Sequence, residues 1–246
     1  LSEKHSFRRI INKIMKQIIA IGGGGFGREI KDLKIEKYIV DQCQKENPSI
    51  CFVPTATGDD PGYIENFYKA FDSLNCKTSH IDFFKRTINL QEHIYNQDII
   101  FVGGGNTKSM LAVWREWGLD KILLKAYSNG AIMSGVSAGA ICWFEQGITD
   151  SWKEHQAVLP CLGFIDGICC PHYDEEPERI PYVSKVLKSK EIEDCIAIEG
   201  FCALHVINDI PKYVVSFGND GNSYKVSYKD NEIIHDSIPK TKRIKL

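Results

Sequence analysis

The stretch Ala131-Ile-Met-Ser-Gly-Val-Ser-Ala-Gly-Ala-Ile-Cys-Trp-Phe144 decides how the rest of the chain is interpreted. It begins with a short apolar run, turns at Gly135-Val-Ser-Ala-Gly139, and continues with residues that favour a helix. This is the G-x-S-x-G pattern of a nucleophile elbow, where a serine lies on a tight strand-to-helix turn. An ordinary turn that contains serine would give the same pattern. If the elbow forms, Ser137 is exposed at a helix N-terminus, and the Ala138 amide is a candidate oxyanion donor.

The chain before this stretch alternates apolar segments with amphipathic ones. We expect strands near 17–25, 49–55, 76–84 and 97–107, and helices near 35–45, 60–74, 108–117 and 119–128. This alternation predicts an α/β fold with a doubly wound, mostly parallel sheet and helices on both faces. Ligands bind at the carboxyl ends of strands in such sheets. The glycines at 22–25, 103–105 and 135–139 would meet at that edge, which predicts a site there.

The chain after the elbow changes character. We expect a loop at 147–152 and a helix at 175–190. Between them, residues 159–172 predict a turn followed by a strand that ends at His172. From residue 194 short alternating strands predict a small antiparallel C-terminal extension, followed by a basic tail at 240–246. We expect one domain over 1–246. The basic, partly amphipathic residues 1–16 are expected to form an extension or a surface helix, because they lack the features of a targeting peptide.

The composition excludes several classes of protein. A formal net charge of −2 gives no electrostatic basis for binding nucleic acid, and no apolar run approaches the length of a membrane span. The nine cysteines lie mostly within apolar runs, which indicates free, buried thiols and a cytoplasmic location. Cys169 and Cys170 precede His172 but lack metal-binding C-x-x-C spacing, so we expect no metal site and no cofactor.

A nucleotide-binding module is one alternative. Gly22, Gly24 and Gly27 fit the G-x-G-x-x-G pattern of dinucleotide sites. The second strand, however, ends in Pro54-Thr55, where that fold needs an acidic residue for the ribose. The pattern alone is therefore weak support for a nucleotide.

A catalytic serine needs a base, and histidine is the usual one. His172 ends a predicted strand after Pro171, which would place it at the sheet edge that holds Ser137. His205 lies inside an apolar strand and is expected to be a core residue. The sequence therefore predicts that Ser137 and His172 meet. In a non-enzymatic binding module with a vestigial elbow, by contrast, they would lie too far apart to hydrogen bond.

Three segments together resemble the peptidase E family: Gly103-Gly-Gly-Asn-Thr107, Gly135-Val-Ser-Ala-Gly-Ala140 and Pro171-His172. These are cytoplasmic serine peptidases related to cyanophycinases, with a fold similar to class I glutamine amidotransferases. The resemblance covers Gln17 to Phe217. It implies that Ser137 is the nucleophile and His172 the general base. It also implies an oxyanion hole from Ala138 with Gly104 or Gly105, beside a substrate-binding loop that Asn106 shapes.

The resemblance leaves the third catalytic residue open between Glu199, which ends an apolar strand, and Asp150, which lies in a predicted loop. It also implies a dipeptidase or exopeptidase that cuts after an N-terminal Asp, with Arg179 as the partner of the substrate carboxylate. Acidic residues surround Arg179, which departs from the family pattern and keeps two other readings open. Arg179 could be a solvated helix residue, or the substrate could be a β-linked or cationic, Arg-bearing peptide, as in cyanophycinase-like members. The expected partner is a small peptide, and a homodimer is left open.

Overall fold

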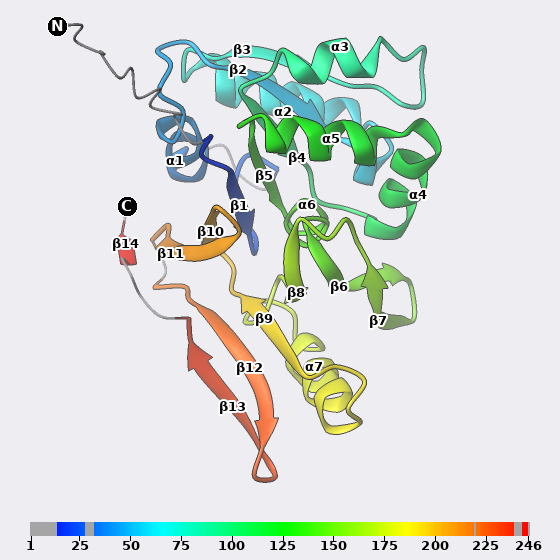
Figure 1. Ribbon diagram of the computed structural model, residues 1–246, viewed down its shortest axis with the longest axis vertical. Coiled ribbons are helices and arrows are strands. Elements are labelled where there is room, and N and C mark those ends of the chain that lie inside the picture. The colour runs from blue at the N-terminus through cyan, green and yellow to red at the C-terminus, as the bar shows by residue number, and fades with distance from the viewer. Residues whose placement is uncertain (1–13, 28–31, 219, 239–242, 246) are drawn as a thin grey trace, which may run out of the picture.

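The computed structural model describes residues 14–27, 32–218, 220–238 and 243–245. Its strands form two sheets, one of eight strands and one of six. Figure 1 shows the eight-stranded sheet above the six-stranded one, with the hairpin of β12 and β13 at the lower end. Most of the expected extension at 1–16 lies outside the described residues, and residues 14–16 belong to no helix or strand.

The eight-stranded sheet has the order β14-β11-β10-β1-β5-β4-β2-β3. Its five strands from β1 to β3 in this order run parallel to their neighbours, as the β-α alternation predicts, whereas β10 is antiparallel to β1. In chain order the strands are β1 (Gln17–Ile21), β2 (Ser49–Val53), β3 (Lys77–His80), β4 (Ile99–Val102), β5 (Ile132–Val136), β10 (Cys202–Ile207), β11 (Ile210–Ser216) and β14 (Arg243–Lys245).

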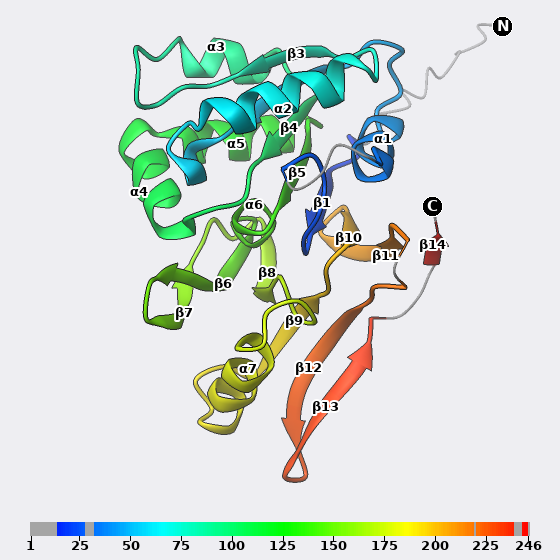
Figure 2. The ribbon, with the colours of Figure 1, turned by 180° about the vertical axis from the view of Figure 1, so that it is seen from behind.

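Helices cover both faces of this sheet. In the described part of the chain the helices near this sheet are α1 (Lys34–Asp41), α2 (Pro61–Asp72), α3 (Leu90–Tyr95), α4 (Thr107–Trp117), α5 (Leu119–Ser128) and the short α6 (Ala138–Ile141), with a 3₁₀ turn at Thr55–Thr57. The remaining helix, α7 (Arg179–Lys188), packs against the small sheet. Neighbouring β1 residues point to opposite faces: Ile19 belongs to the buried cluster that contains residues of α1 and α2, and Ile18 belongs to the cluster that contains residues of α3, α4 and α5. Accordingly, α5 lies in front of the sheet in Figure 1, and α2 lies in front of it in Figure 2. The predicted α/β fold is confirmed.

The six-stranded sheet is the main departure from the sequence-based expectation. Its order is β13-β12-β9-β8-β6-β7, with bounds β6 (Phe144–Trp152), β7 (His155–Pro160), β8 (Ile165–Cys170), β9 (Asp194–Ile198), β12 (Ser223–Lys229) and β13 (Glu232–Ser237). The predicted loop at 147–152 is wrong, because these residues belong to β6 and pair with β7 and β8. The C-terminal strands exist as predicted, but they do not form one extension. β10 and β11 join the large sheet, whereas β9, β12 and β13 join the small one.

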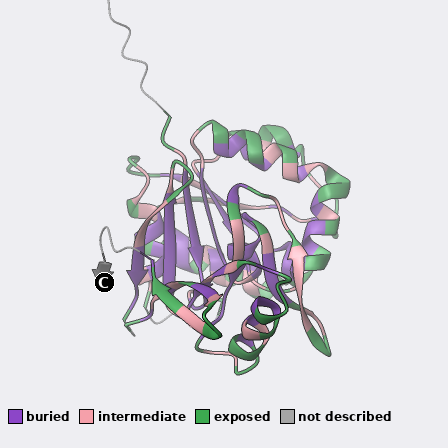
Figure 3. Cartoon of the chain, turned by 60° about the horizontal axis from the view of Figure 1, so that its bottom comes forward, coloured by how far each residue is buried: buried purple, intermediate pink, exposed green. Residues whose placement is uncertain are grey.

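One hydrophobic cluster joins the two sheets. Phe144 and Ile165 of the small sheet belong to the same buried cluster as Val102 and Met133 of the large sheet. Figure 3 shows the buried residues gathered on the strands and the exposed residues on the outer sides of the helices. Within the described ranges, no helix is both long and apolar enough to span a bilayer. The tail is not wholly frayed as predicted, because Arg243–Lys245 pairs in parallel with β11.

Candidate active site

Ser137 lies on the turn between β5 and α6. Its backbone has φ 57° and ψ −113°, a region that costs a residue with a side chain conformational energy and is often found at functional sites. The turn leaves little space, because a Cβ at Gly139 would overlap the carbonyl of Val102, and one at Gly135 would overlap that of Gly139. The glycines of the G-x-S-x-G motif are therefore required by the close packing of strand and helix, as the elbow interpretation expects.

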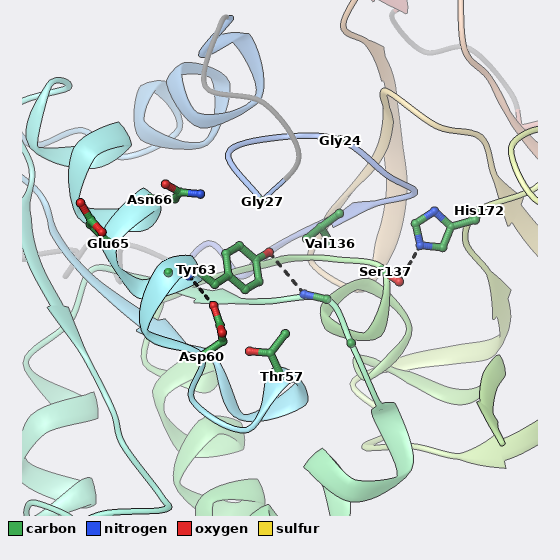
Figure 4. Close-up of a pocket in the computed structure, with 13 residues that line it drawn as sticks. Gly24, Gly27, Thr57, Asp60, Tyr63, Glu65, Asn66, Val136, Ser137 and His172 are labelled. Carbon is green, nitrogen blue, oxygen red and sulfur yellow. Dashed lines mark hydrogen bonds between the residues drawn. The ribbon is translucent and has the colours of Figure 1, made fainter. Parts of the chain in front are cut away.

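His172 meets Ser137 from the other sheet. It follows β8 through Pro171, and its Nε2 lies 2.6 Å from the Ser137 Oγ. His172 is 6% exposed, so its imidazole is shielded from bulk water but open to the pocket that it lines. Figure 4 shows the two side chains pointing toward each other at one end of this pocket. The structure thus brings together the two residues that the sequence pairs.

The carboxylate beside the second imidazole nitrogen belongs to Glu175, which was not among the predicted catalytic residues. Its Oε2 lies 3.1 Å from the His172 Nδ1. The chain turns back between the two residues, since the Glu175 amide donates to the His172 carbonyl at 3.2 Å. The space around the carboxylate is closed by glycines, because a Cβ at Gly200 would overlap the Glu175 side chain and one at Gly23 would lie 2.5 Å from its Oε2.

The two predicted acidic partners of His172 have other contacts, so the hydrogen bond expected from Glu199 or Asp150 is made by Glu175 instead. The Glu199 Oε2 accepts a hydrogen bond of 2.7 Å from the Asn222 amide, which fixes the turn before β12. Asp150 lies on β6 with 61% of its side chain exposed, and its carboxylate lies 3.5 Å from the Arg179 guanidinium. Both are therefore better explained as structural residues.

The predicted oxyanion donors lie around Ser137. Ala138 is the first residue of α6, where helix geometry leaves the amide N–H without an intrahelical acceptor. Gly104 is adjacent, because a Cβ there would lie 3.3 Å from the Ser137 Cβ. Its amide, however, donates to the Tyr63 hydroxyl at 3.4 Å. Gly105 also lines the pocket, and its φ of 132° is one that a residue with a side chain rarely adopts.

Asn106 and Arg179, the predicted substrate-binding residues, do not line this pocket. Asn106 caps α4 by accepting from the Ser109 amide at 2.9 Å, and its side chain also donates to the Ser151 carbonyl at 3.0 Å. These two hydrogen bonds hold the start of α4 against β6. Arg179 is 1% exposed and its Nε donates to Glu176 at 2.7 Å. It is neither a solvated helix residue nor free to meet a substrate from this buried position.

The pocket beside Ser137 has a volume of about 630 Å³. It extends from the catalytic pair to the N-terminal turn of α2, as Figure 4 shows. Among the described residues that line it, the acidic side chains are Asp60, which caps α2, and Glu65, which pairs with Lys69 at 2.6 Å. Tyr63 and Asn66 add polar groups to the wall. Within the described residues, no group of three or more His, Cys, Asp or Glu side chains is placed to hold a metal ion.

The glycines of the G-x-G-x-x-G pattern make room for protein atoms. A Cβ at Gly22 would overlap the Glu199 carbonyl, one at Gly24 would lie 3.0 Å from the Phe201 ring, and one at Gly27 would lie 2.8 Å from the Tyr63 ring. Because these neighbours account for all three glycines, the pattern needs no bound pyrophosphate to explain it. The nucleotide alternative therefore loses its main support.

Comparison with known sequences finds a family whose model matches this chain. The model of peptidase family S51 matches residues 18–213, which include Ser137 and His172. The chain is similar to the uncharacterized peptidase YgaJ of Bacillus subtilis (strain 168), with 45% identity over 226 residues that cover 92% of this chain and 98% of that protein. It is also similar to the uncharacterized peptidase Lmo0363 of Listeria monocytogenes, with 27% identity over 54% of this chain and 69% of that protein.

Two solved structures share the fold. A peptidase from an acI-B1 actinobacterium superposes with a TM-score of 0.67 at 16% identity, covering 92% of this chain and 98% of that one. A putative peptidase E protein from Listeria monocytogenes EGD-e superposes with a TM-score of 0.60 at 18% identity, covering 91% and 99%. At such low identity these likenesses establish the fold alone, whereas the family match spans most of the chain. The chain therefore belongs to peptidase family S51.

Proposed function

We propose that this peptidase hydrolyses short peptides by acyl-enzyme chemistry, with Ser137 as nucleophile and His172 as general base. The observation that supports this most directly is the 2.6 Å separation between the Ser137 Oγ and the His172 Nε2 at the end of a pocket. A serine hydroxyl becomes an effective nucleophile only when a base accepts its proton, and that base must lie within hydrogen-bonding distance. A vestigial binding module would not need this contact.

Each step of the reaction has a residue to perform it. The Ser137 Oγ attacks the peptide carbonyl carbon while its proton moves to the His172 Nε2. When the C–N bond of the tetrahedral intermediate breaks, His172 returns this proton to the leaving amine. A water molecule then attacks the acyl-serine ester, His172 again accepts a proton, and the Ser137 oxygen leaves with it. The chemistry follows the general scheme of serine hydrolases.

Glu175 is proposed as the residue that orients His172. With the imidazole neutral, a proton on Nδ1 donates to the Glu175 carboxylate at 3.1 Å and leaves the Nε2 lone pair directed at Ser137. The carboxylate also stabilises the imidazolium that forms when the serine proton is transferred. This role replaces the one that the resemblance assigned to Glu199 or Asp150.

The oxyanion is proposed to bind backbone amides at the start of α6. The Ala138 N–H lies on the residue after the nucleophile, which is the usual position of one donor in an elbow. Gly105 is the better second donor, because the Gly104 amide already donates to the Tyr63 hydroxyl. Fixed amides of this kind stabilise the tetrahedral intermediate without reorganisation.

The size of the pocket supports a short substrate, as in a dipeptidase or another exopeptidase. Its volume of about 630 Å³ falls within the range of roughly 300–1,000 Å³ that is typical of small-ligand pockets. Arg179 lends no support to an Asp-X preference, because the guanidinium is buried among its own carboxylates. The second candidate, a hydrolase of Arg-bearing peptides, has the carboxylates Asp60 and Glu65 on the pocket wall in its favour, although Asp60 already caps α2 and Glu65 already pairs with Lys69 at 2.6 Å. A dipeptide library with acidic, neutral and basic side chains separates these substrate classes.

Labelling with a fluorophosphonate tests the proposed chemistry without a known substrate. The wild-type protein should form one covalent adduct at Ser137, and Ser137→Ala should form none. Ser134→Ala is the matched control, because Ser134 lies on the same strand but is buried and donates to the Ile100 carbonyl. This variant should label like the wild type. An adduct that persists in Ser137→Ala, or a wild-type protein that never labels, contradicts the proposed mechanism.

A further inference from the structure

Tyr63 is held rigidly at the wall of the pocket, although the proposed reaction gives it no part. It lies in the first turn of α2, where the Asp60 side chain caps the helix by accepting from the Tyr63 amide at 2.7 Å. Its ring packs against Phe26 and Phe52, with centroid distances of 5.2 and 5.0 Å. The backbone and the ring are thus both fixed, so the hydroxyl has one defined position in the pocket (Figure 4).

Two glycine-ended strands leave space for this ring. A Cβ at Gly27, beyond β1, would lie 2.9 Å from the Tyr63 hydroxyl, and a Cβ at Gly103, beyond β4, would lie 2.9 Å from the ring. Any larger residue at either position would push the tyrosine out of the pocket wall. The loops that converge at the carboxyl edge of the sheet are therefore built around Tyr63 as well as around Ser137.

The hydroxyl has a proton to donate. Its oxygen accepts from the Gly104 amide at 3.4 Å, so the amide occupies one of its lone pairs. Burial raises the pKa of Tyr63 to about 12, so the hydroxyl keeps its proton at neutral pH. Within the described part of the chain, no side chain or carbonyl accepts this proton. A hydroxyl that lines a pocket and is oriented by a backbone amide is prepared to donate to whatever oxygen enters the pocket.

We propose that Tyr63 binds the substrate, and that its hydroxyl donates a hydrogen bond to an oxygen of the bound peptide. This proposal rests on the proposed peptidase function of Ser137 and His172. The oxygen belongs either to a backbone carbonyl or to the free C-terminal carboxylate of a short peptide. Gly104 lies next to Ser137, and its amide donates to the Tyr63 hydroxyl. A peptide oxygen bound to this hydroxyl is therefore held at a defined place relative to Ser137.

Tyr63→Phe tests this assignment, because it removes one oxygen atom and keeps the ring that fills the space beside Gly27 and Gly103. We expect kcat/KM on a short peptide to fall about tenfold or more, the typical effect of losing one well-placed hydrogen bond. Fluorophosphonate labelling of Ser137 should stay within about threefold of the wild type, since this reagent has no peptide oxygen for Tyr63 to bind. Tyr68→Phe is the matched control: it lies on the same helix, and its hydroxyl bonds to His80 at 2.7 Å, outside the pocket lining. It should keep the wild-type kcat/KM.

The same kinetic comparison, repeated with a C-terminally amidated peptide, identifies the oxygen that Tyr63 binds. If amidation of the substrate's C-terminus abolishes the difference between wild type and Tyr63→Phe, the acceptor is the carboxylate; if the difference persists, it is a backbone carbonyl. An unchanged kcat/KM overturns the proposal, and so does an increase, which would mean that the hydroxyl only occupies the Gly104 amide. An equal fall in labelling and in kcat/KM also overturns it, by placing the effect at Ser137. Absence of labelling in the wild type would instead contradict the proposed function itself.

Discussion

The Glu175 Oε2 lies 3.1 Å from the Nδ1 of His172, only three residues away along the chain. Histidine and carboxylate come from one turn after β8, whereas in many serine hydrolases these residues come from distant segments. The arrangement makes the orientation of the imidazole depend on a local turn and on the glycines that enclose it.

Glu175→Gln should lower kcat/KM by about 100-fold or more, because an amide neither stabilises the imidazolium nor enforces the proton on Nδ1. The measurement is steady-state cleavage of a short peptide, with circular dichroism to check the fold. Asp150→Asn is the matched control, since its carboxylate is exposed and pairs with Arg179; its kcat/KM should change less than about threefold. A larger loss in Asp150→Asn than in Glu175→Gln would favour Asp150 over Glu175 as the catalytic acid.

Ser137→Gly should abolish activity and at the same time stabilise the fold. Serine at φ 57° is strained, and glycine adopts this backbone conformation without a steric cost. We expect the free energy of unfolding to rise by about 1 kcal/mol in urea denaturation, relative to Ser137→Ala. Ser134→Gly provides the contrast, because this residue lies within β5 and glycine weakens a strand. A destabilised Ser137→Gly would mean that the turn is not strained.

Arg179→Ala should destabilise the protein by about 2–4 kcal/mol without changing substrate preference. The substitution leaves the Glu176 carboxylate and the Ile148 carbonyl, which accepts from Arg179 at 3.1 Å, without their partner. Thermal denaturation measures the loss, and the ratio of kcat/KM for Asp-X and Ala-X dipeptides measures the preference. A selective fall for Asp-X would return Arg179 to the substrate site.

His205 should make the fold sensitive to mild acid. It is fully buried, with its Nδ1 2.8 Å from the Tyr38 hydroxyl, and burial lowers its pKa from 6.5 to about 4. The unfolded chain therefore binds a proton between these values that the folded chain does not bind, so stability falls as the pH drops. Between pH 7 and pH 5 this should cost about 2 kcal/mol. In urea denaturation, the pH dependence should be correspondingly weaker in His205→Gln. An equal dependence in both proteins would rule out this origin.

The parallel strands of the large sheet and the elbow could be predicted because their signals are local. The helix predicted at 119–128 has the same bounds as α5, and the apolar run before Ser137 forms β5. The small sheet was harder to predict from the sequence. Its strand β6 has Gly147 and polar residues in place of a regular alternation, and its pairing with β8 is a long-range property. Single segments therefore indicated strands but not the sheet to which each strand belongs.

The site residues that belong to a sequence motif could be predicted. Those whose place in the site depends on contacts between distant segments could not. Ser137 belongs to a recognisable turn, and His172 ends a recognisable strand. Glu175 lies in an acidic run whose members look alike in sequence, and the H-x-x-E spacing from His172 was the available signal. Tyr63 lies on the helix predicted at 60–74, and nothing in the spacing of that helix reveals that its ring reaches the glycines at 27 and 103.

The nucleophile belongs to the large sheet, and its base belongs to the small one. The distance between the Ser137 Oγ and the His172 Nε2 therefore depends on how the two sheets pack against each other. A displacement of about 1 Å between reacting groups can reduce an enzyme's rate about 100-fold. A cavity made at Phe144 or Ile165, which belong to the cluster that joins the two sheets, is therefore expected to lower the rate of hydrolysis by shifting Ser137 and His172 relative to each other. Because the catalytic pair is assembled from both sheets, activity should be more sensitive than the fold to changes at the contact between the sheets.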